Sequence, residues 1–274
     1  MDQTTLGGNV RSEPEQDDSA IDPRLFVGSV QKAMRVLEAF DRDHRTMSIA
    51  EVASRTGLGR SAAQRFVYTL EKIGYLTRTP QTREYMLSNR AFRFVQCIVA
   101  TNVALSRSLP LLAQLAEFTG ETVSWVELDG DEVVVIHGVP SPNRTAITLP
   151  VGSRFPALTA STGHLFLADL PRERVRRMFD AAAPKTRARL GGMDFDTYYA
   201  HVLARREAGY SLTEKEVDVS SLSVSVPVLD LRGRVTAGIN VSVLRERTPV
   251  EKIRSEVLPR LTALGETASS FALG

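Results

Sequence analysis

Three polar side chains recur every fourth residue at Arg60, Gln64 and Tyr68, so a helix would present them on one face. Ser61 and Arg65 lie beside them. An arginine can donate two hydrogen bonds to guanine and a glutamine can pair with adenine, whereas serine and tyrosine more often hold phosphate. These five side chains are therefore candidate contacts to double-stranded DNA. The alternative is an ordinary solvated helix surface, which uses the same residue types.

The segment that carries these residues has the pattern of a helix packed against other helices. Over residues 60–73 the opposite side of the helix is apolar, with Ala63, Phe66, Val67, Leu70 and Ile73. A tight turn at Leu58-Gly59 separates it from a short helix that starts with a capping box at Ser48–Glu51 and ends at Gly57. An earlier helix is predicted over 29–42, and its apolar face contains Val30, Met34, Leu37 and Phe40.

A hairpin follows the third predicted helix. Two short strands, 75–79 and 84–87, enclose the turn at 80–83. Three helices followed by a hairpin predict a winged helix-turn-helix, whose third helix enters the major groove of DNA. At the wing, phosphates or the minor groove are within reach of Arg78, Gln81, Thr82 and Arg83.

The charge distribution supports this division of the chain. The net charge is only +2, but residues 1–20 contain five acidic residues and one basic residue, whereas residues 21–90 contain 12 Lys/Arg against 7 Asp/Glu. An asymmetry of this kind indicates a nucleic-acid or membrane partner, although a basic block of about 70 residues can also be simply solvated. Residues 1–22 are predicted to form a disordered acidic tail.

The rest of the chain combines strands and helices around a candidate ligand site. Strand patterns at 122–128 and 132–139 are joined by Asp129-Gly130, and a strand-like pattern returns over 217–243. Hydroxyl groups stand at a predicted helix start, where free backbone amides can bind a carboxylate, and others alternate with apolar residues in the strands. The alternating strand residues are Ser223, Ser225, Asn240 and Ser242. Together with Ser161 and Thr162 they are candidate contacts, with Trp125 and Leu149 as apolar walls. Alternating serines also commonly face solvent, and this alternative stays open.

Catalysis, metal binding and membrane insertion find little support. The histidines at 44, 137, 164 and 201 are scattered, without metal-ligand spacing, and Ser161 with His164 is the one pair suggestive of a hydrolase. We expect no catalytic residue, metal or cofactor. The chain has one cysteine, Cys97, which predicts a cytoplasmic protein without an internal disulfide. Its longest aliphatic run is Val133–Ile136, which is too short to span a membrane.

Several short motifs follow one another in a distinctive order. They are Ser29–Ala33, Val36–Phe40, Ile49–Ala53, Thr56–Ala62, Arg65–Leu70, Leu128–Val134, Gly152–Pro156, Thr159–Gly163, Ala208–Tyr210 and Ala237–Ser242. In this order and spacing they resemble the IclR family of bacterial transcription regulators, over about residues 26–272. The chain departs from the family pattern at Gly59, where Ser or Thr is usual, at Thr213, where an acidic residue is common, and over 220–223.

The resemblance implies an α+β protein with a defined order of parts. A winged helix-turn-helix DNA-binding domain over 23–88 would be followed by a linker helix over 89–104. Residues 105–274 would form a GAF/profilin-like effector domain with an antiparallel sheet and a pocket for a small organic acid. Thr213 enters the candidate pocket through the family's pocket positions, together with Ser161, Thr162, Ser223, Asn240 and Ser242.

The resulting hypothesis is a regulator, repressor or activator, of a catabolic operon. It would bind a pseudo-palindromic operator as a dimer or a dimer of dimers, with the N-terminal and linker helices, including Phe92, Val95 and Val99, supplying dimer contacts. An organic acid would change operator affinity by binding one arrangement of the dimer better than the other. The alternatives are an enzyme on the C-terminal domain and an architectural DNA-binding protein without a ligand.

Overall fold

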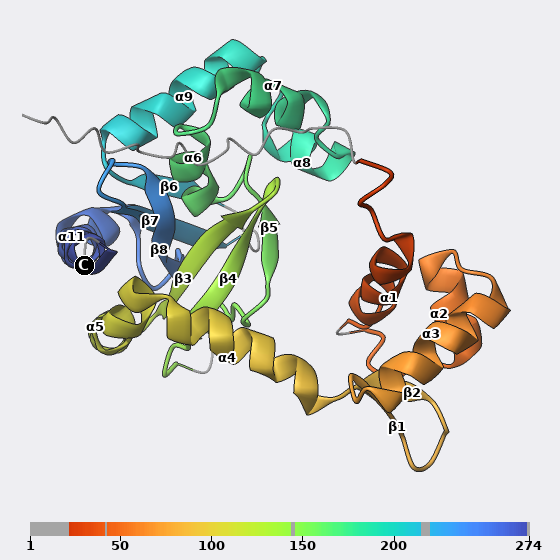
Figure 1. Cartoon of the computed structure of the whole chain (residues 1–274). Coiled ribbons are helices and arrows are strands. Elements are labelled where there is room, and N and C mark those ends of the chain that lie inside the picture. Colours follow the sequence, from red (N-terminus) through yellow and green to blue (C-terminus); the bar gives the residue numbers. More distant parts are fainter. Residues whose placement is uncertain (1–21, 42, 144–145, 215–219, 273–274) are drawn as a thin grey trace, which may run out of the picture. The chain divides into compact units, whose positions relative to one another are not determined.

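The computed structural model describes residues 22–41, 43–143, 146–214 and 220–272 (Figure 1). It contains two compact units, one ending at Val95 and the other starting at Gln96. The boundary lies within the segment 89–104, which the sequence predicts to be a linker. Except for Asp22, the predicted acidic tail lies outside the described residues.

The first unit is a three-helix domain with a two-stranded wing. Its elements are α1 (Gly28–Glu38), α2 (Ile49–Thr56), α3 (Arg60–Lys72), β1 (Leu76–Arg78) and β2 (Tyr85–Leu87). The predicted capping box is present, because Ser48 Oγ accepts from the Glu51 amide and the Glu51 carboxylate accepts from the Ser48 amide at 2.7 Å. Gly57 ends α2 with φ of 67°, a conformation that glycine adopts without strain.

The apolar face predicted for the first helix is only partly buried. Phe40 is in the core beside Val36, whereas Val30 and Met34 are 59% and 47% exposed. The predicted apolar face therefore lies only partly in the core of this domain, and Val30 and Met34 lie outside it. The helix contacts the core only through its C-terminal half, so its first turns present apolar side chains to the outside.

The second unit is built on a six-stranded antiparallel sheet in the order β5-β4-β3-β8-β7-β6. The strands are β3 (Thr122–Asp129), β4 (Glu132–Val139), β5 (Arg154–Pro156), β6 (Ser211–Glu214), β7 (Ser221–Leu229) and β8 (Val235–Leu244). The helices before it are α4 (Phe92–Thr101) and α5 (Val103–Thr119), and the later ones are α6 (Ser161–Leu167), α7 (Arg172–Asp180), α8 (Pro184–Arg189), α9 (Phe195–Glu207), α10 (Val250–Lys252) and α11 (Leu258–Ala272). Together the two units give the predicted α+β class.

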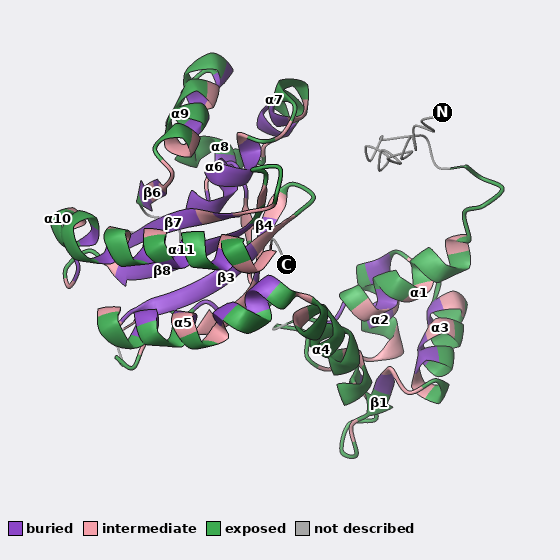
Figure 2. Ribbon diagram, turned by 60° about the vertical axis from the view of Figure 1, so that its left-hand side comes forward, coloured by how far each residue is buried: buried purple, intermediate pink, exposed green. Residues whose placement is uncertain are grey.

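The helices cover the sheet in two layers, and the buried residues concentrate between them (Figure 2). On one side α5 and α11 pack over a continuous apolar core that includes Val123, Trp125 and Ile239. On the other side α6, with α7 and α9 outside it, packs over a second core that includes Val126 and Val135. Every residue of α6 is buried. Among the described residues no single helix is long and apolar enough to span a membrane; α4 and α5 meet that requirement only as a pair, bent by 87° at their junction.

The start of the last helical segment differs from its sequence pattern. Thr248-Pro249-Val250-Glu251 has the pattern of a capping box, but the N-cap is Pro249 and the Thr248 hydroxyl donates instead to Glu121 at 3.1 Å. A π-helical turn over Ile253–Val257 precedes Pro259, a residue that favours a break in a helix. A wide turn before a proline accommodates the residue that cannot donate a helical hydrogen bond.

A buried ion pair joins the beginning of the sheet to this last helical segment. The Glu121 side chain is completely buried and receives two hydrogen bonds from Arg247, each of 2.7 Å. Breaking a buried pair leaves a desolvated charge without its partner and costs several kcal/mol, whereas exposed pairs contribute little.

We expect Arg247→Ala to lower the free energy of unfolding by about 3 kcal/mol, because the fully buried Glu121 carboxylate loses its charged partner. The matched control is Asp180→Ala, which removes an exposed pair with Arg176 and should cost less than about 1 kcal/mol. Urea unfolding followed by circular dichroism measures both. Equal losses in the two variants would contradict this role of Glu121.

Candidate nucleic-acid interface and ligand site

The outer face of α3 carries all five side chains predicted to contact DNA. Its inner face is buried through Ala63, Val67 and Leu70, and the predicted residues Arg60, Ser61, Gln64, Arg65 and Tyr68 are all exposed. Within the described part of the chain, no hydrogen bond or ion pair holds the side chains of the first four. Lys72 Nζ lies 5.4 Å from the centre of the Tyr68 ring. The hydrogen-bond donors of these first four side chains are therefore available to a partner.

The two arginines of the wing differ: Arg83 is exposed, whereas Arg78 contacts other residues of the domain. Arg83 is exposed and has φ of 59°, an unusual value for a residue with a side chain. Hydrogen bonds before and after Arg83 support the turn. The Thr79 and Thr82 hydroxyls bond to each other at 2.6 Å, and the Glu84 carboxylate accepts from the hydroxyls of Thr46 and Thr82. Arg78, by contrast, donates to Glu71 at 2.9 Å and lies over the Tyr85 ring. Gln81 and Thr82 are exposed at the tip.

The second unit contains a buried polar surface on one face of its sheet. Eight side chains from four neighbouring strands form two rows of directly paired residues. The first row is Ser211, Ser225, Asn240 and Ser124, and the second is Thr213, Ser223, Ser242 and Thr122. All are at least 92% buried. We call these eight residues the polar face. The opposite face of the same strands is apolar, since residues alternate in direction along a strand.

A glycine on β8 lets α6 lie close to the polar face, since a side chain at Gly238 would come within 2.5 Å of Thr162. A second glycine, Gly163, packs α6 against the segment before it, where a side chain would come within 2.1 Å of the Ala157 carbonyl oxygen. The close approach places Ser161 Oγ 2.7 Å from Ser225 Oγ and 3.3 Å from Asn240 Oδ1. Ser161 and Thr162 therefore lie against the polar face, as predicted for residues that share one site.

At the β3 end of the polar face, one hydroxyl has no partner. Ser124 Oγ is buried and makes no hydrogen bond. The backbone of Leu149 passes beside it, because a Cβ at Gly138 would meet both Leu149 O at 3.2 Å and Ser124 Oγ at 3.7 Å. A buried hydroxyl without a partner costs free energy, so this position favours a bound molecule that supplies one.

Trp125 is not part of this arrangement. It follows Ser124 on β3, so its side chain lies on the opposite face of the sheet, in the core under α5 and α11. Its indole N–H donates to Glu127 at 2.9 Å, and the side-chain amide of Asn102 donates to the same oxygen at 2.8 Å. Trp125 therefore lies on the other side of the sheet from the serines with which the sequence grouped it.

Three members of the polar face are absent from the residues that the sequence suggests. These are Thr122, Ser124 and Ser211. The signal for them is the same alternation of polar and apolar residues, which extends into β3 and β6. Thr213, Ser223, Asn240 and Ser242, which the sequence did suggest, all belong to the polar face.

His164 and Arg205 form a further polar cluster at the β6 end of the polar face. Burial lowers the pKa of His164 to about 3, and the nearby charge of Arg205 acts in the same direction. His164 contacts Ser211 and the Leu158 carbonyl oxygen, whereas Ser161 contacts Ser225 and Asn240. The pair that suggested a hydrolase is thus engaged in two separate sets of hydrogen bonds. Within the described ranges no group of His, Cys, Asp and Glu residues is arranged to hold a metal ion.

Comparison with known protein families identifies both units. The family model for the bacterial transcriptional regulator IclR C-terminal domain matches residues 96–270, and the model for the IclR helix-turn-helix domain matches residues 29–80. The chain belongs to the IclR family. It is a transcriptional regulator with a helix-turn-helix domain and an IclR effector domain rather than an enzyme.

Individual relatives agree with this assignment. This IclR-family regulator is 27% identical over 239 residues to the Pca regulon regulatory protein of Pseudomonas putida, a match that covers 87% of this chain and 81% of that protein. It is 29% identical over 246 residues to the p-hydroxybenzoate hydroxylase transcriptional activator of Acinetobacter baylyi, covering 86% and 88%. Among solved structures, an IclR transcriptional regulator from Alicyclobacillus acidocaldarius has a TM-score of 0.78 at 25% identity, covering 90% of this chain and 99% of that one.

A solved structure with a ligand has the same fold. It is an IclR homolog from Microbacterium hydrocarbonoxydans complexed with 4-hydroxybenzoate, with a TM-score of 0.73 at 18% identity. The match covers 89% of this chain and 98% of that one.

The buried His164 should make the stability of the regulator depend on pH. Its pKa in the folded protein, about 3, lies below the ordinary 6.5, so between these values the unfolded chain binds a proton that the folded chain does not. The free energy of unfolding therefore falls as the pH falls below about 6.5, by at most about 1.4 kcal/mol per pH unit. We expect His164→Gln to remove this contribution.

Urea unfolding at about pH 7 and about pH 5 measures the dependence. If His164→Gln and the wild type lose the same free energy between the two pH values, His164 is not buried as a neutral group.

Proposed function

We propose that the protein is a cytoplasmic regulator that binds a pseudo-palindromic operator as a homo-oligomer and changes its operator affinity when a small organic acid binds in the effector domain. The observation that carries the proposal is the polar face: eight buried hydroxyl and amide side chains under a helix, one of them without a partner. A face of this composition is costly as a protein core but suits a polar ligand.

The surface of α3 supports operator binding. Arg60 and Gln64 are exposed, are not engaged with other described residues, and are suited to guanine and adenine. Arg65, Ser61 and Arg83 complete a surface that can hold phosphates. Arg78 plays a smaller part in this proposal, because Glu71 already neutralises its charge.

Exposed apolar side chains support a homo-oligomer. In the first unit they are Leu25, Phe26, Val27, Val30 and Met34, and on α4 they are Phe92, Phe94, Val95 and Ile98. Exposed apolar side chains concentrated in short segments are a feature of interfaces between proteins. Val99, also predicted as a dimer contact, packs instead against the core of the effector domain. Two copies would present two α3 helices, as a pseudo-palindromic site requires.

An aromatic or small aliphatic monocarboxylate fits the effector domain. Hydroxyl and amide groups of the polar face can hydrogen-bond a carboxylate and ring substituents, and Leu149 lies at its edge. The complex of the Microbacterium hydrocarbonoxydans protein with 4-hydroxybenzoate supports an aromatic acid, as does the name of the Acinetobacter baylyi activator. Binding that differs between two arrangements of the oligomer would alter its affinity for DNA.

For operator binding, we expect Arg60→Ala and Arg65→Ala each to weaken binding by about 5- to 150-fold, the effect of losing one good contact to a base. Arg254→Ala, which removes an exposed arginine of the effector domain, is the matched control and should leave binding unchanged. Fluorescence anisotropy with an operator fragment at several salt concentrations measures affinity. Wild-type affinity in both α3 variants, or affinity independent of salt, would rule out this surface.

For ligand binding, two buried serines without hydrogen-bond partners provide a matched pair. Ser124 belongs to the polar face, whereas Ser108 lies on α5 at the apolar face, and both hydroxyls are unpartnered. We expect Ser124→Ala to reduce the thermal shift produced by the best acid of a panel of organic acids, and Ser108→Ala to leave it unchanged. The same acid should alter operator binding of the wild type. A panel without any stabilising acid would contradict the proposed ligand class.

A further inference from the structure

Arg205 brings a positive charge to the β6 end of the polar face, and no carboxylate among the described residues pairs with it. Its Nη1 lies 3.1 Å from Nδ1 of the buried His164. In the part of the chain that the structure describes, Arg205 makes no ion pair, whereas the next residue on α9, Arg206, pairs with Asp169 at 3.3 Å. Burial also lowers the pKa of Arg205 below its ordinary value, as expected for a partly desolvated charge.

The hydrogen bonds of His164 determine which of its nitrogens carries a proton. Its Nε2 lies 3.0 Å from the carbonyl oxygen of Leu158, which can only accept, so Nε2 carries the hydrogen. The Tyr198 hydroxyl donates to the same oxygen at 2.8 Å. In the neutral ring the other nitrogen, Nδ1, therefore has one lone pair and accepts a hydrogen bond.

Two donors compete for this single lone pair. Arg205 Nη1 is 3.1 Å from Nδ1, and Ser211 Oγ is 3.2 Å from it. When one donates fully, the other has an unused hydrogen, and the guanidinium has further N–H groups. Ser211 is the first member of the row that continues through Ser225 to Asn240, so this surplus of donors adjoins the polar face.

We propose that Arg205 and Ser211 form the anion-binding end of the ligand site, that they hold the carboxylate of the organic acid, and that His164 is a positioning residue for the guanidinium. The inference rests on the proposed function and adds to it the orientation of the ligand. The carboxylate points to β6 and α9, and the remainder of the molecule extends along the polar face toward Ser124 and Leu149. All eight residues of the polar face are neutral, so recognition of charge depends on Arg205.

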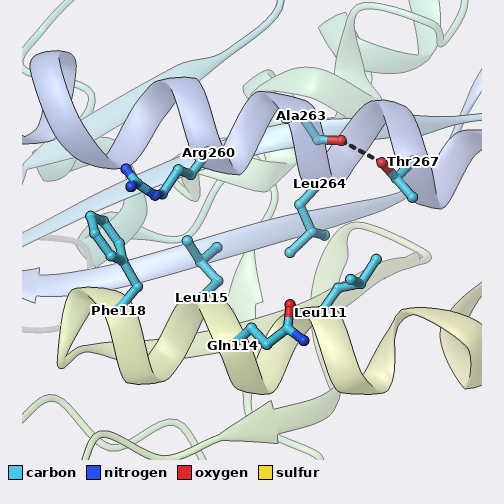
Figure 3. A pocket seen from close by; sticks show the side chains of 8 residues that line it. All are labelled: Leu111, Gln114, Leu115, Phe118, Arg260, Ala263, Leu264 and Thr267. Atoms are coloured by element: carbon cyan, nitrogen blue, oxygen red, sulfur yellow. Dashed lines mark hydrogen bonds between the residues drawn. The ribbon is translucent and has the colours of Figure 1, made fainter.

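Arg260 is a matched control for Arg205. It also makes no ion pair among the described residues, but it belongs to α11, on the other side of the sheet. Its guanidinium lies 3.6 Å from the centre of the Phe118 ring, at one end of a groove of about 390 Å³ between α5 and α11 (Figure 3). Arg205→Gln and Arg260→Gln thus remove the same charge from opposite faces of the effector domain.

The experiment compares carboxylic acids with their neutral primary amides. Isothermal titration of the full-length regulator uses benzoate with benzamide, 4-hydroxybenzoate with 4-hydroxybenzamide, and pyruvate with pyruvamide. For the acid that binds best, we expect the wild type to prefer the acid to its amide by about tenfold or more, since the bond from the guanidinium is charge-assisted. Arg205→Gln should abolish this preference while it retains amide binding, and Arg260→Gln should preserve both affinities.

The outcomes separate the two proposals. If no acid binds the wild type, the proposed function itself fails. If Ser124→Ala weakens acid binding while Arg205→Gln keeps the full preference for the acid, the ligand site stands and the role of Arg205 is wrong. If Arg260→Gln is the variant that loses the preference, the acid occupies the groove between α5 and α11, and both proposals fail.

The positioning role of His164 has its own test. His164→Leu removes the acceptor for Arg205, so it should reduce the preference for the acid as Arg205→Gln does, and the double variant should show no further loss. His164→Gln keeps an oxygen acceptor and should restore most of the preference. Thermal unfolding confirms that each variant is folded. An unchanged preference in a folded His164→Leu variant, or additive losses in the double variant, would overturn this role.

Discussion

Alternation of side chains along β3, β7 and β8 is the constraint on which the effector domain depends. Ser221–Val228 has polar residues or proline at every other position, so one side of the strand is apolar and the other is not. The apolar sides of adjacent strands form the core under α5 and α11, which supplies the hydrophobic stabilisation. The hydroxyl groups then have to lie on the other side, where water is excluded by α6. The apolar core and the proposed ligand site therefore use the same strands and opposite faces.

The two units position their functional side chains in different ways. In the DNA-binding unit a single helix, α3, buries one side and exposes the other, so its contacts need only local structure. In the effector domain the site is assembled from four strands, α6 and α9, and depends on the absence of side chains at Gly163 and Gly238. Because α6 lies so close to the sheet, even one methyl group at Gly238 would require the Thr162 side chain to move.

Local features of the sequence predicted most of the elements. The capping box at Ser48, the turn at Gly57 and the hairpin at Asp129-Gly130 depend on residues a few positions apart, and all three are present. Features that depend on distant partners were not predictable. Thr248 bonds to Glu121, which is 127 residues away, in preference to capping its own helix. The alternation around Trp125 was visible, but which side faces the ligand is decided only by pairing with β8. Likewise, no spacing rule connects His164 with Arg205 on another helix.

The carboxylate of Glu127 has a mechanical consequence. It binds Trp125 on its own strand and Asn102, the residue at which α4 ends and α5 begins, and Asn102 in turn caps α5 through its side-chain oxygen. Ser124 lies three residues before Glu127 on β3, so the unpartnered serine of the polar face and the junction of α4 and α5 are joined through one short stretch of strand. Any shift of β3 at Ser124 would therefore act first on the hydrogen bonds that hold Asn102 at this junction.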